Sequence, residues 1–434
     1  MANNNTQQSK HFSNQYLNQY AEIESSTISK IPHEIRKNIK AKNTLIIPAY
    51  NEAPEFLSRL KKHPVKNCFF ILVNNSPDNK NNGDHKNNIL HNFTQESGEI
   101  LWELDNVKLI RWPNENFLIS VDRFSKQKKI PAKQGVGLAR KIACDIAIKL
   151  IQDELLDSKF IHSTDADATL PENYFLQTNE LLNSRNISAA TYNYSHSKEI
   201  SDIAEATDIY EQSMRYYVDG LHWAKSRFAF HTIGSCLAIS AEHYCMARGF
   251  PKKSGGEDFY LLNKLAKLGE INSLEGDPIL ISSRESDRVP FGTGPAVSKI
   301  IASEKRLNYP VYSPEIFVEL KKLLNQFEEL IFITDYTKDG SSESQSVLQS
   351  TLNRCEQWLF SLSPRSREAL LSLNIESLFT HLISQCKKHQ QKREHITYWF
   401  DGFKTLKYIH FLQQHQHPAI PLRQALITSK ALGF

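Results

Sequence analysis

The stretch TLIIPAY, Thr44–Tyr50, is a short and almost wholly apolar run of residues. Runs of this length fit strands that are buried on both faces of a parallel sheet. Similar apolar runs return in FFILVNNSPDN (Phe69–Asn79), VKLIRW (Val107–Trp112) and KFIHSTDAD (Lys159–Asp167). These four runs predict strands that are buried on both faces of one parallel sheet.

A helical pattern lies between the last two runs, in VGLARKIACDIAIKLI, Val136–Ile151. Large apolar residues recur there every four positions, at Leu138, Ile142, Ile146 and Leu150. Such a ridge forms the buried face of a helix. Strands that alternate with helices indicate a layered α/β domain with a mostly parallel sheet.

The character of the chain changes at two points. Residues 1–42 are polar and are expected to form a tail or an arm laid over the main domain. Residues 43–305 carry the strand and helix pattern. Residues 306–434 hold long segments with helical spacing, for example at Phe317, Leu320 and Phe327. The sequence therefore predicts an N-terminal arm, an α/β domain and an α-helical C-terminal domain.

Composition excludes several classes of protein. The chain has 434 residues, 40% of them hydrophobic, and its 52 basic and 48 acidic residues give a net charge of +4. This balance gives no reason to expect nucleic-acid binding.

No apolar run approaches the roughly 20 residues of a transmembrane segment, and the N-terminus lacks the apolar core of a secretory signal. The six cysteines have no CxxC spacing, which favours free thiols over a disulfide framework or a zinc site. We expect a soluble cytoplasmic protein.

Polar clusters follow three of the predicted strands, at Tyr50–Glu52, Asn74–Ser76 and Asp165–Asp167. Ligands of open α/β sheets bind outside the carboxyl ends of the strands. If the strands are parallel, these clusters meet at one edge and form a single site.

The pair Asp165 and Asp167 is a candidate metal site. In an extended turn, residues two apart point to the same side. Mg²⁺ and Mn²⁺ take one or two such carboxylates, together with substrate phosphates and water. An isolated D-x-D is more often a solvated acidic turn, so the pair alone does not establish a metal site.

The motifs at these positions occur in a fixed order: IIPAYNE, VNNSPD, QGVGLARK, STDADATLPENYF and GGEDFYLLNKLAKLG. This ordered set resembles the family-two glycosyltransferases, GT-A-fold enzymes that move a sugar from a nucleotide diphosphate carrier. The resemblance covers about Thr44 to Ala302. It implies a Rossmann-like domain with helices on both faces of its sheet, a donor of the UDP or GDP type, and Mn²⁺ or Mg²⁺ as cofactor.

The resemblance also implies roles for single residues. One group is expected to hold the nucleotide-sugar: Pro48, Ala49, Tyr50, Glu52, Lys133, Gly135 and Arg140. Asp167 is expected to bind the metal ion, and Asp165 to contact the ribose or reach the metal. Asn74 and Asn75 stand where many members carry an acidic pair, so the nucleotide preference stays open. Gly135 equally fits a helix-entry turn, and Arg140 a surface helix position.

Glu257 and Asp258 open a predicted helix for which Gly269 is the expected C-cap. Acids are favoured at a helix N-terminus without any catalytic role. The resemblance to the glycosyltransferases implies catalytic roles for both acids. Asp258 is expected to deprotonate the acceptor hydroxyl, with inversion of the sugar, and Glu257 to orient the acceptor.

Other interpretations remain open at this stage. Arg284 and Arg288 either clamp the diphosphate or form surface ion pairs. A retaining transferase commonly adds a late histidine ligand, which ISSRESDRVPFGTGPA (Ile281–Ala296) lacks. A sugar nucleotidyltransferase needs a glycine-rich loop that IIPAYNEAPEF (Ile46–Phe56) lacks. A non-catalytic nucleotide- or carbohydrate-binding scaffold is the alternative outside enzymes. The C-terminal helices are expected to dimerise, bind the acceptor or buttress the main domain.

Overall fold

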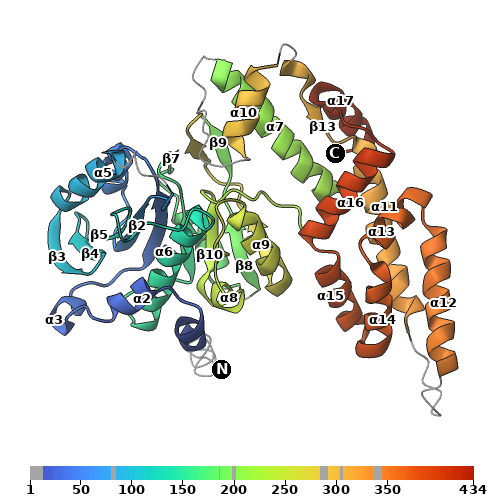
Figure 1. Cartoon of the computed structure of the whole chain (residues 1–434), viewed down its shortest axis with the longest axis horizontal. Coiled ribbons are helices and arrows are strands. Elements are labelled where there is room, and N and C mark those ends of the chain that lie inside the picture. Colours follow the sequence, from blue (N-terminus) through green and yellow to red (C-terminus); the bar gives the residue numbers. More distant parts are fainter. Residues whose placement is uncertain are drawn as a thin grey trace. The chain divides into compact units, whose positions relative to one another are not determined.

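The computed structural model describes residues 13–79, 85–184, 186–197, 202–283, 292–303, 306–335 and 345–434. The chain divides into two compact units (Figure 1). The first consists of Met1–Ala204 and Thr232–Ala296, and the second of Glu205–His231 and Val297–Phe434.

A nine-stranded sheet forms the core of the first unit. Its strands, in spatial order, are β11 (Glu270–Ser273), β8 (Ile187–Thr191), β10 (Leu237–Ser240), β6 (Phe160–Ser163), β1 (Asn43–Ala49), β2 (Cys68–Asn75), β5 (Phe117–Arg123), β4 (Val107–Arg111) and β3 (Glu99–Leu104). β10 and β4 run antiparallel to both of their neighbours, and all the other pairings are parallel. All the strands except β10 and β4 therefore point the same way, which confirms the predicted mostly parallel α/β sheet.

The centre of this sheet is buried on both faces. All eight residues of β2 are buried, as are all residues of β1 except Asn43. In the parallel register, Ala49 of β1 lies opposite Asn74 of β2, and Ile46 of β1 lies opposite Ser163 of β6. The polar clusters that follow these three strands therefore share one edge of the sheet, as the sequence predicted.

Helices cover both faces of the sheet. The chain passes from β1 through α4 (Glu55–Lys62) to β2 on one side, and from β5 through α6 (Gly135–Gln152) to β6 on the other side of β1. Because such crossovers are right-handed, opposite directions of travel put α4 and α6 on opposite faces. Figure 1 shows α6 and α5 (His85–Glu96) on different sides of β2.

This path makes a topological switch point. β1 has β2 on one side and β6 on the other, and the direction of winding reverses between β1 and β6. In open α/β sheets, ligands bind at the carboxyl ends of the strands where this reversal occurs. The fold therefore directs attention to the residues that follow β1 and β6.

The N-terminal arm packs on α6. Tyr16 Oη donates to Asp145 Oδ1 over 2.5 Å, and the backbone N–H of Glu22 donates to Asp145 Oδ2 over 2.8 Å. Lys141 Nζ donates to the same Oδ2 over 2.7 Å, and Tyr244 Oη donates to Oδ1 over 3.1 Å. Asp145 is fully buried, so these four donors compensate a charge that water does not reach.

The second unit is helical, which confirms the prediction of a helical C-terminal region. Two of its helices, α7 (Asp202–Trp223) and α10 (Thr293–Ile301), begin in the first unit. The others are α11 (Pro314–Ile333), α12 (Gln345–Ser361), α13 (Pro364–Ser372), α14 (Ile375–Gln385), α15 (His389–Trp399), α16 (Gly402–His415) and α17 (Leu422–Leu432). α11 supplies the core with Phe317, Leu320 and Phe327. Gly220 of α7 lets α11 approach closely, because a Cβ at this position would lie 2.7 Å from the Phe317 ring.

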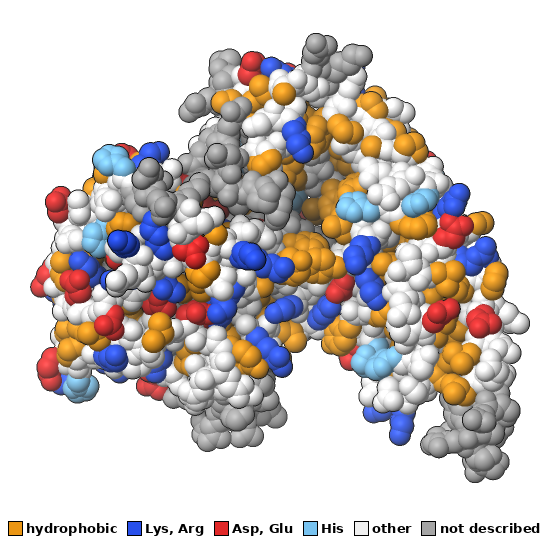
Figure 2. Space-filling model, in the orientation of Figure 1, with side chains coloured by type: hydrophobic (Ala, Val, Ile, Leu, Met, Phe, Trp, Pro, Cys, Tyr) orange, Lys and Arg blue, Asp and Glu red, His pale blue; other side chains and the backbone are white. Residues whose placement is uncertain are grey.

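No helix in the described ranges is both long and apolar enough to cross a bilayer. The six cysteines are free and buried. On the face of the first unit that Figure 2 shows, acidic and basic side chains are intermingled.

Candidate functional site

Arg140 connects two acidic segments at the edge of the sheet. From α6, its Nε donates to Glu257 Oε1 over 2.9 Å, and its Nη2 donates to Asp165 Oδ1 over 2.7 Å. The side chains of Arg140 and Glu257 are 4% and 5% exposed, whereas that of Asp165 is 37% exposed. Glu257 begins α9 (Glu257–Leu268), and Asp165 lies in the turn after β6. One guanidinium thus brings the D-x-D turn and the start of α9 together.

Two residues that the sequence did not single out hold Arg140 in place. Its Nη1 donates to Ser163 Oγ over 3.0 Å, and that hydroxyl donates to the carbonyl of Gly234 over 2.8 Å. A Cβ at Gly234 would lie only 2.4 Å from Arg140 Nη2, so glycine leaves the room that the guanidinium fills. Ser163 begins the quoted motif STDADATLPENYF and Gly234 lies in none of the quoted motifs, but for both residues the contact with Arg140 depends on how distant segments pack.

The protonation of this cluster follows from its burial and charge. Burial by itself would lower the pKa of Arg140, but Asp165 and Glu257 raise it above its ordinary value. Asp258 is half-buried. Its partial removal from water, followed by the negative charge of Glu257, raises the pKa of Asp258 to about 7, against the opposing effect of Arg140. A carboxylate with a pKa near neutrality is well matched to accepting a proton at physiological pH.

Glycines in the first turn of α6 fix the loop that leads to α9. Gly135 has a φ of +38°, and a Cβ there would lie 2.7 Å from Ser254 Cα. A Cβ at Gly137 would lie 2.6 Å from the carbonyl oxygen of Lys253, which accepts a hydrogen bond from the Gly137 N–H over 2.9 Å. Gly256, with a φ of 69°, then turns the chain into α9. The structure thus gives these glycines a packing role, and the approach of Gly135 to a nucleotide stays a prediction.

The D-x-D turn links β6 to the short strand β7 (Ala168–Thr169). The N–H of Ala168 donates to the carbonyl of Asp165 over 3.1 Å, and the N–H of Ser282 donates to the carbonyl of Asp167 over 3.2 Å. Both acidic side chains are half-buried.

The oxygen donors of Asp165 and Asp167 suit a hard divalent cation. One oxygen of Asp165 accepts a hydrogen bond from Arg140, and the role of Asp167 as principal ligand stays a prediction from the sequence. Within the described ranges, neither acid belongs to a group of three or more converging His, Cys, Asp or Glu side chains. Substrate and water oxygens would therefore complete the shell of an ion held here.

The turn after β1 carries a residue in the left-handed region. Asn51 has a φ of 55°, and its N–H donates to Asn87 Oδ1 of α5 over 2.8 Å. It separates the half-buried Tyr50 from the buried Glu52. Asparagine tolerates this backbone conformation better than most residues, and such strained positions concentrate at functional sites. The preceding Pro48 and Ala49 are buried within β1 itself.

The amides that replace the usual acidic pair bind mainly within the protein. Asn75 Nδ2 donates to the carbonyl of Ala49 over 2.9 Å and so joins β2 to β1. Asn74 Nδ2 donates to the carbonyl of Asn87 over 2.8 Å, and Asn87 Nδ2 donates to the carbonyl of Asn75 over 3.0 Å. The buried Asn74 Oδ1 has no hydrogen-bond partner among the described residues. Asn87 was missed by the sequence interpretation because it lies within a helix, away from the strand ends.

The structure gives no evidence of a binding role for the remaining predicted site residues that it describes. Lys133 is exposed in the turn before α6. Arg284 and Arg288 lie outside the described residues. α9 ends before Gly269, as predicted, but Gly269 has an extended backbone with a φ of −166°. Glycine is needed there for another reason, because a Cβ would lie 2.4 Å from the carbonyl oxygen of Asn186.

Comparison with known proteins gives limited similarity. No protein-family model matches the chain, and no curated protein matches it significantly. Among solved structures, S. aureus TarS 1–349 in complex with UDP-GlcNAc matches with 12% identity and a TM-score of 0.37, over 86% of this chain and 92% of that chain. The complex of the same fragment with UDP matches with 11% identity and the same TM-score and coverage. A likeness of this degree establishes neither activity nor substrate for this chain.

Proposed function

We propose that this chain is a glycosyltransferase that uses a divalent cation to move a sugar from a nucleotide diphosphate donor to an acceptor hydroxyl. The observation that carries the proposal is the contact of Arg140 with both Asp165, at 2.7 Å, and Glu257, at 2.9 Å. These contacts bring the acidic turn after β6 next to Asp258. Oxygen ligands for a cation and a carboxylate suited to accept a proton thus occur together at the β1/β6 switch point.

Asp167 would hold Mn²⁺ or Mg²⁺, and Asp165, oriented by Arg140, would support it. When bound, the cation would neutralise negative charge on the departing diphosphate. The D-x-D turn suits this task because its backbone is tied down by the hydrogen bonds of Asp165 and Asp167 described above. The two carboxylates would thereby extend from a fixed backbone before the donor arrives.

The nucleotide would bind beside Tyr50 and Glu52, where β1 and β2 end. The unpartnered Asn74 Oδ1 is a hydrogen-bond acceptor, and its own amide N–H is already used within the protein. Leaving a buried acceptor unpaired is costly, so a ligand that supplies a donor is favoured. Every nucleobase has at least one N–H donor on its pairing edge, as a ring N–H in uracil and guanine or as an amino group in cytosine and adenine. Asn74 Oδ1 thus supports binding of a nucleotide at this position, while the UDP or GDP type is proposed from the resemblance of the sequence motifs alone.

Asp258 would act as the general base. As the acceptor oxygen attacks the anomeric carbon, its proton passes to the Asp258 carboxylate and the bond from that carbon to the diphosphate oxygen breaks. This single displacement inverts the anomeric centre. Glu257 is buried and bound to Arg140, so we assign it the positioning of α9 rather than direct contact with the acceptor.

The test is a donor screen by mass spectrometry with the full chain and a panel of UDP- and GDP-sugars, with and without Mn²⁺. UDP-GlcNAc, which is present in one TarS crystal structure, is the first donor on this panel. We expect slow metal-dependent release of sugar from one donor, lost in Asp258→Asn and kept in Asp157→Asn, which changes an exposed aspartate before β6. Donor binding without turnover, and without any effect of metal, would contradict the proposal and favour a non-catalytic scaffold.

A further inference from the structure

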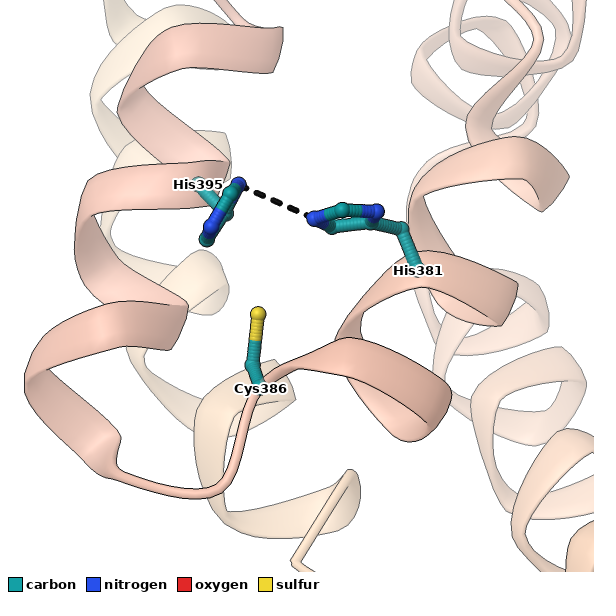
Figure 3. A group of neighbouring side chains, drawn as sticks. All are labelled: His381, Cys386 and His395. Carbon is teal, nitrogen blue, oxygen red and sulfur yellow. Dashed lines mark hydrogen bonds between the residues drawn. The ribbon is translucent and has the colours of Figure 1, made fainter.

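Three side chains with metal-binding atoms converge in the second unit (Figure 3). His381 lies on α14, Cys386 immediately follows that helix, and His395 lies on α15. One ligand atom from each lies within 4.8 Å of the other two. Among the described residues, this is the one group of three His, Cys, Asp or Glu side chains that meets this condition.

The spacing of these atoms is close to that of a tetrahedral metal site. His381 Nε2 and His395 Nδ1 are 3.0 Å apart and share a hydrogen bond. Two nitrogens that each lie about 2.0–2.1 Å from a tetrahedral Zn²⁺ are separated by about 3.3 Å, and a nitrogen and a thiolate by about 3.5 Å. The two imidazoles are therefore almost in position, and small rotations of the side chains bring the sulfur into range. In Figure 3 the sulfur of Cys386 points toward the space between the two rings.

We propose that His381, Cys386 and His395 bind a borderline-soft divalent cation of the Zn²⁺ type. Two imidazoles and a thiolate suit such an ion, whereas Mg²⁺ and Mn²⁺ prefer oxygen ligands. Cys386 is 6% exposed and both histidines are partly exposed, so the site has a protected sulfur and an open side. Three protein ligands leave a fourth position for water or another donor.

Such an ion would fasten α14 to α15. The two helices are joined only by residues 386–388, and the ligands come from both helices and from this connection. The spacing H-x₄-C-x₈-H contains no CxxC pair, which is why the sequence did not favour a zinc site. The inference is independent of the proposed donor site, since it uses different residues and a different class of cation.

The test uses the metal-free full chain in excess Mg²⁺, titrated with Zn²⁺ by calorimetry and with Co²⁺ by absorption spectroscopy. We expect one equivalent of Zn²⁺ to bind and to raise the thermal unfolding temperature. With Co²⁺ we expect a sulfur-to-metal charge-transfer band together with tetrahedral d–d bands. Circular dichroism of each variant shows that it is folded before titration.

The variants locate the site. Cys386→Ala is expected to abolish the charge-transfer band and to weaken Zn²⁺ binding by more than about a hundredfold, since loss of even a group supporting a ligand costs roughly 10–100-fold. His381→Gln is expected to weaken binding similarly, while His415→Gln, at an exposed histidine of α16, leaves it unchanged. A Co²⁺ spectrum without a thiolate band, or equal Zn²⁺ affinity in Cys386→Ala and the parent chain, would overturn the proposal.

Discussion

Arg140 Nε and Glu257 Oε1 lie 2.9 Å apart and join α6 to the first turn of α9. Both side chains are almost completely buried. A buried ion pair is a weak source of stability as a whole, but loss of one partner leaves the other charge without compensation. The geometry of the candidate site therefore depends on this pair remaining intact.

We predict that Arg140→Met destabilises the fold by about 3–5 kcal/mol, because Glu257 is then buried without a partner. The double variant Arg140→Met, Glu257→Gln should lose less unfolding free energy than the two single variants lose together, since the unpaired charge is removed with its partner. Urea unfolding of the four proteins measures this coupling. If the double variant lost the full sum of the two single losses of unfolding free energy, Arg140 and Glu257 would not be coupled.

The pH dependence of transfer should report Asp258. Burial and the charge of Glu257 raise its pKa to about 7, and only the ionised carboxylate can accept a proton. We predict that the rate at saturating donor rises as the pH increases through about 7 and then levels off. Steady-state rates between pH 5 and 9 check this. A rate that is flat from pH 5 upward would exclude Asp258 as the titrating base.

Loss of the base itself should affect chemistry and not donor binding. We predict that Asp258→Asn lowers the transfer rate by roughly 10²–10⁴-fold, the usual contribution of general-base catalysis. Donor affinity, measured by calorimetry, should stay close to that of the parent chain. A collapse of donor affinity in this variant would mean that Asp258 binds the nucleotide-sugar instead.

The same substitution should stabilise the protein at high pH. The pKa of Asp258 is about 7 in the folded chain and 3.8 in its ordinary state, so the unfolded chain loses this proton at lower pH. The cost of ionising the folded carboxyl is thus absent below about pH 4 and complete above about pH 7. Asp258→Asn removes that cost, and its unfolding temperature relative to the parent should be higher at pH 8 than at pH 4. If the difference in unfolding temperature between variant and parent were the same at pH 4 and pH 8, this would contradict the raised pKa of Asp258.

Gly137→Ala should destabilise the chain, although alanine is the better helix former. In an exposed helix the change would stabilise by about 1 kcal/mol. At Gly137 the new Cβ would lie 2.6 Å from the Lys253 carbonyl oxygen, and overpacking of this kind costs about 1–3 kcal/mol. Urea unfolding gives the sign of the effect directly. If Gly137→Ala were more stable than the parent chain, the backbone around Lys253 would be able to shift away from the new Cβ at little cost.

The sequence predicted those parts of the fold that local patterns specify. The apolar runs of β1, β2 and β6 and the ridge of α6 were recognised because burial leaves a periodic trace in the sequence. The contacts of Arg140 with Asp165 and Glu257 leave no such trace, since they depend on how α6, β6 and α9 pack. The same holds for Gly234, which is defined by its closeness to Arg140, and for His381, Cys386 and His395, whose linear spacing hides their convergence.

Calorimetric titration with UDP and with GDP, with and without Mn²⁺, tests the donor site most directly. We predict that one of these nucleotides binds at least roughly tenfold more tightly with Mn²⁺, a difference of about 1.4 kcal/mol. This gain should disappear in Asp167→Asn and persist in Asp157→Asn. Nucleotide affinity that is indifferent to Mn²⁺, or a gain that survives Asp167→Asn, would contradict a cation site at the turn after β6.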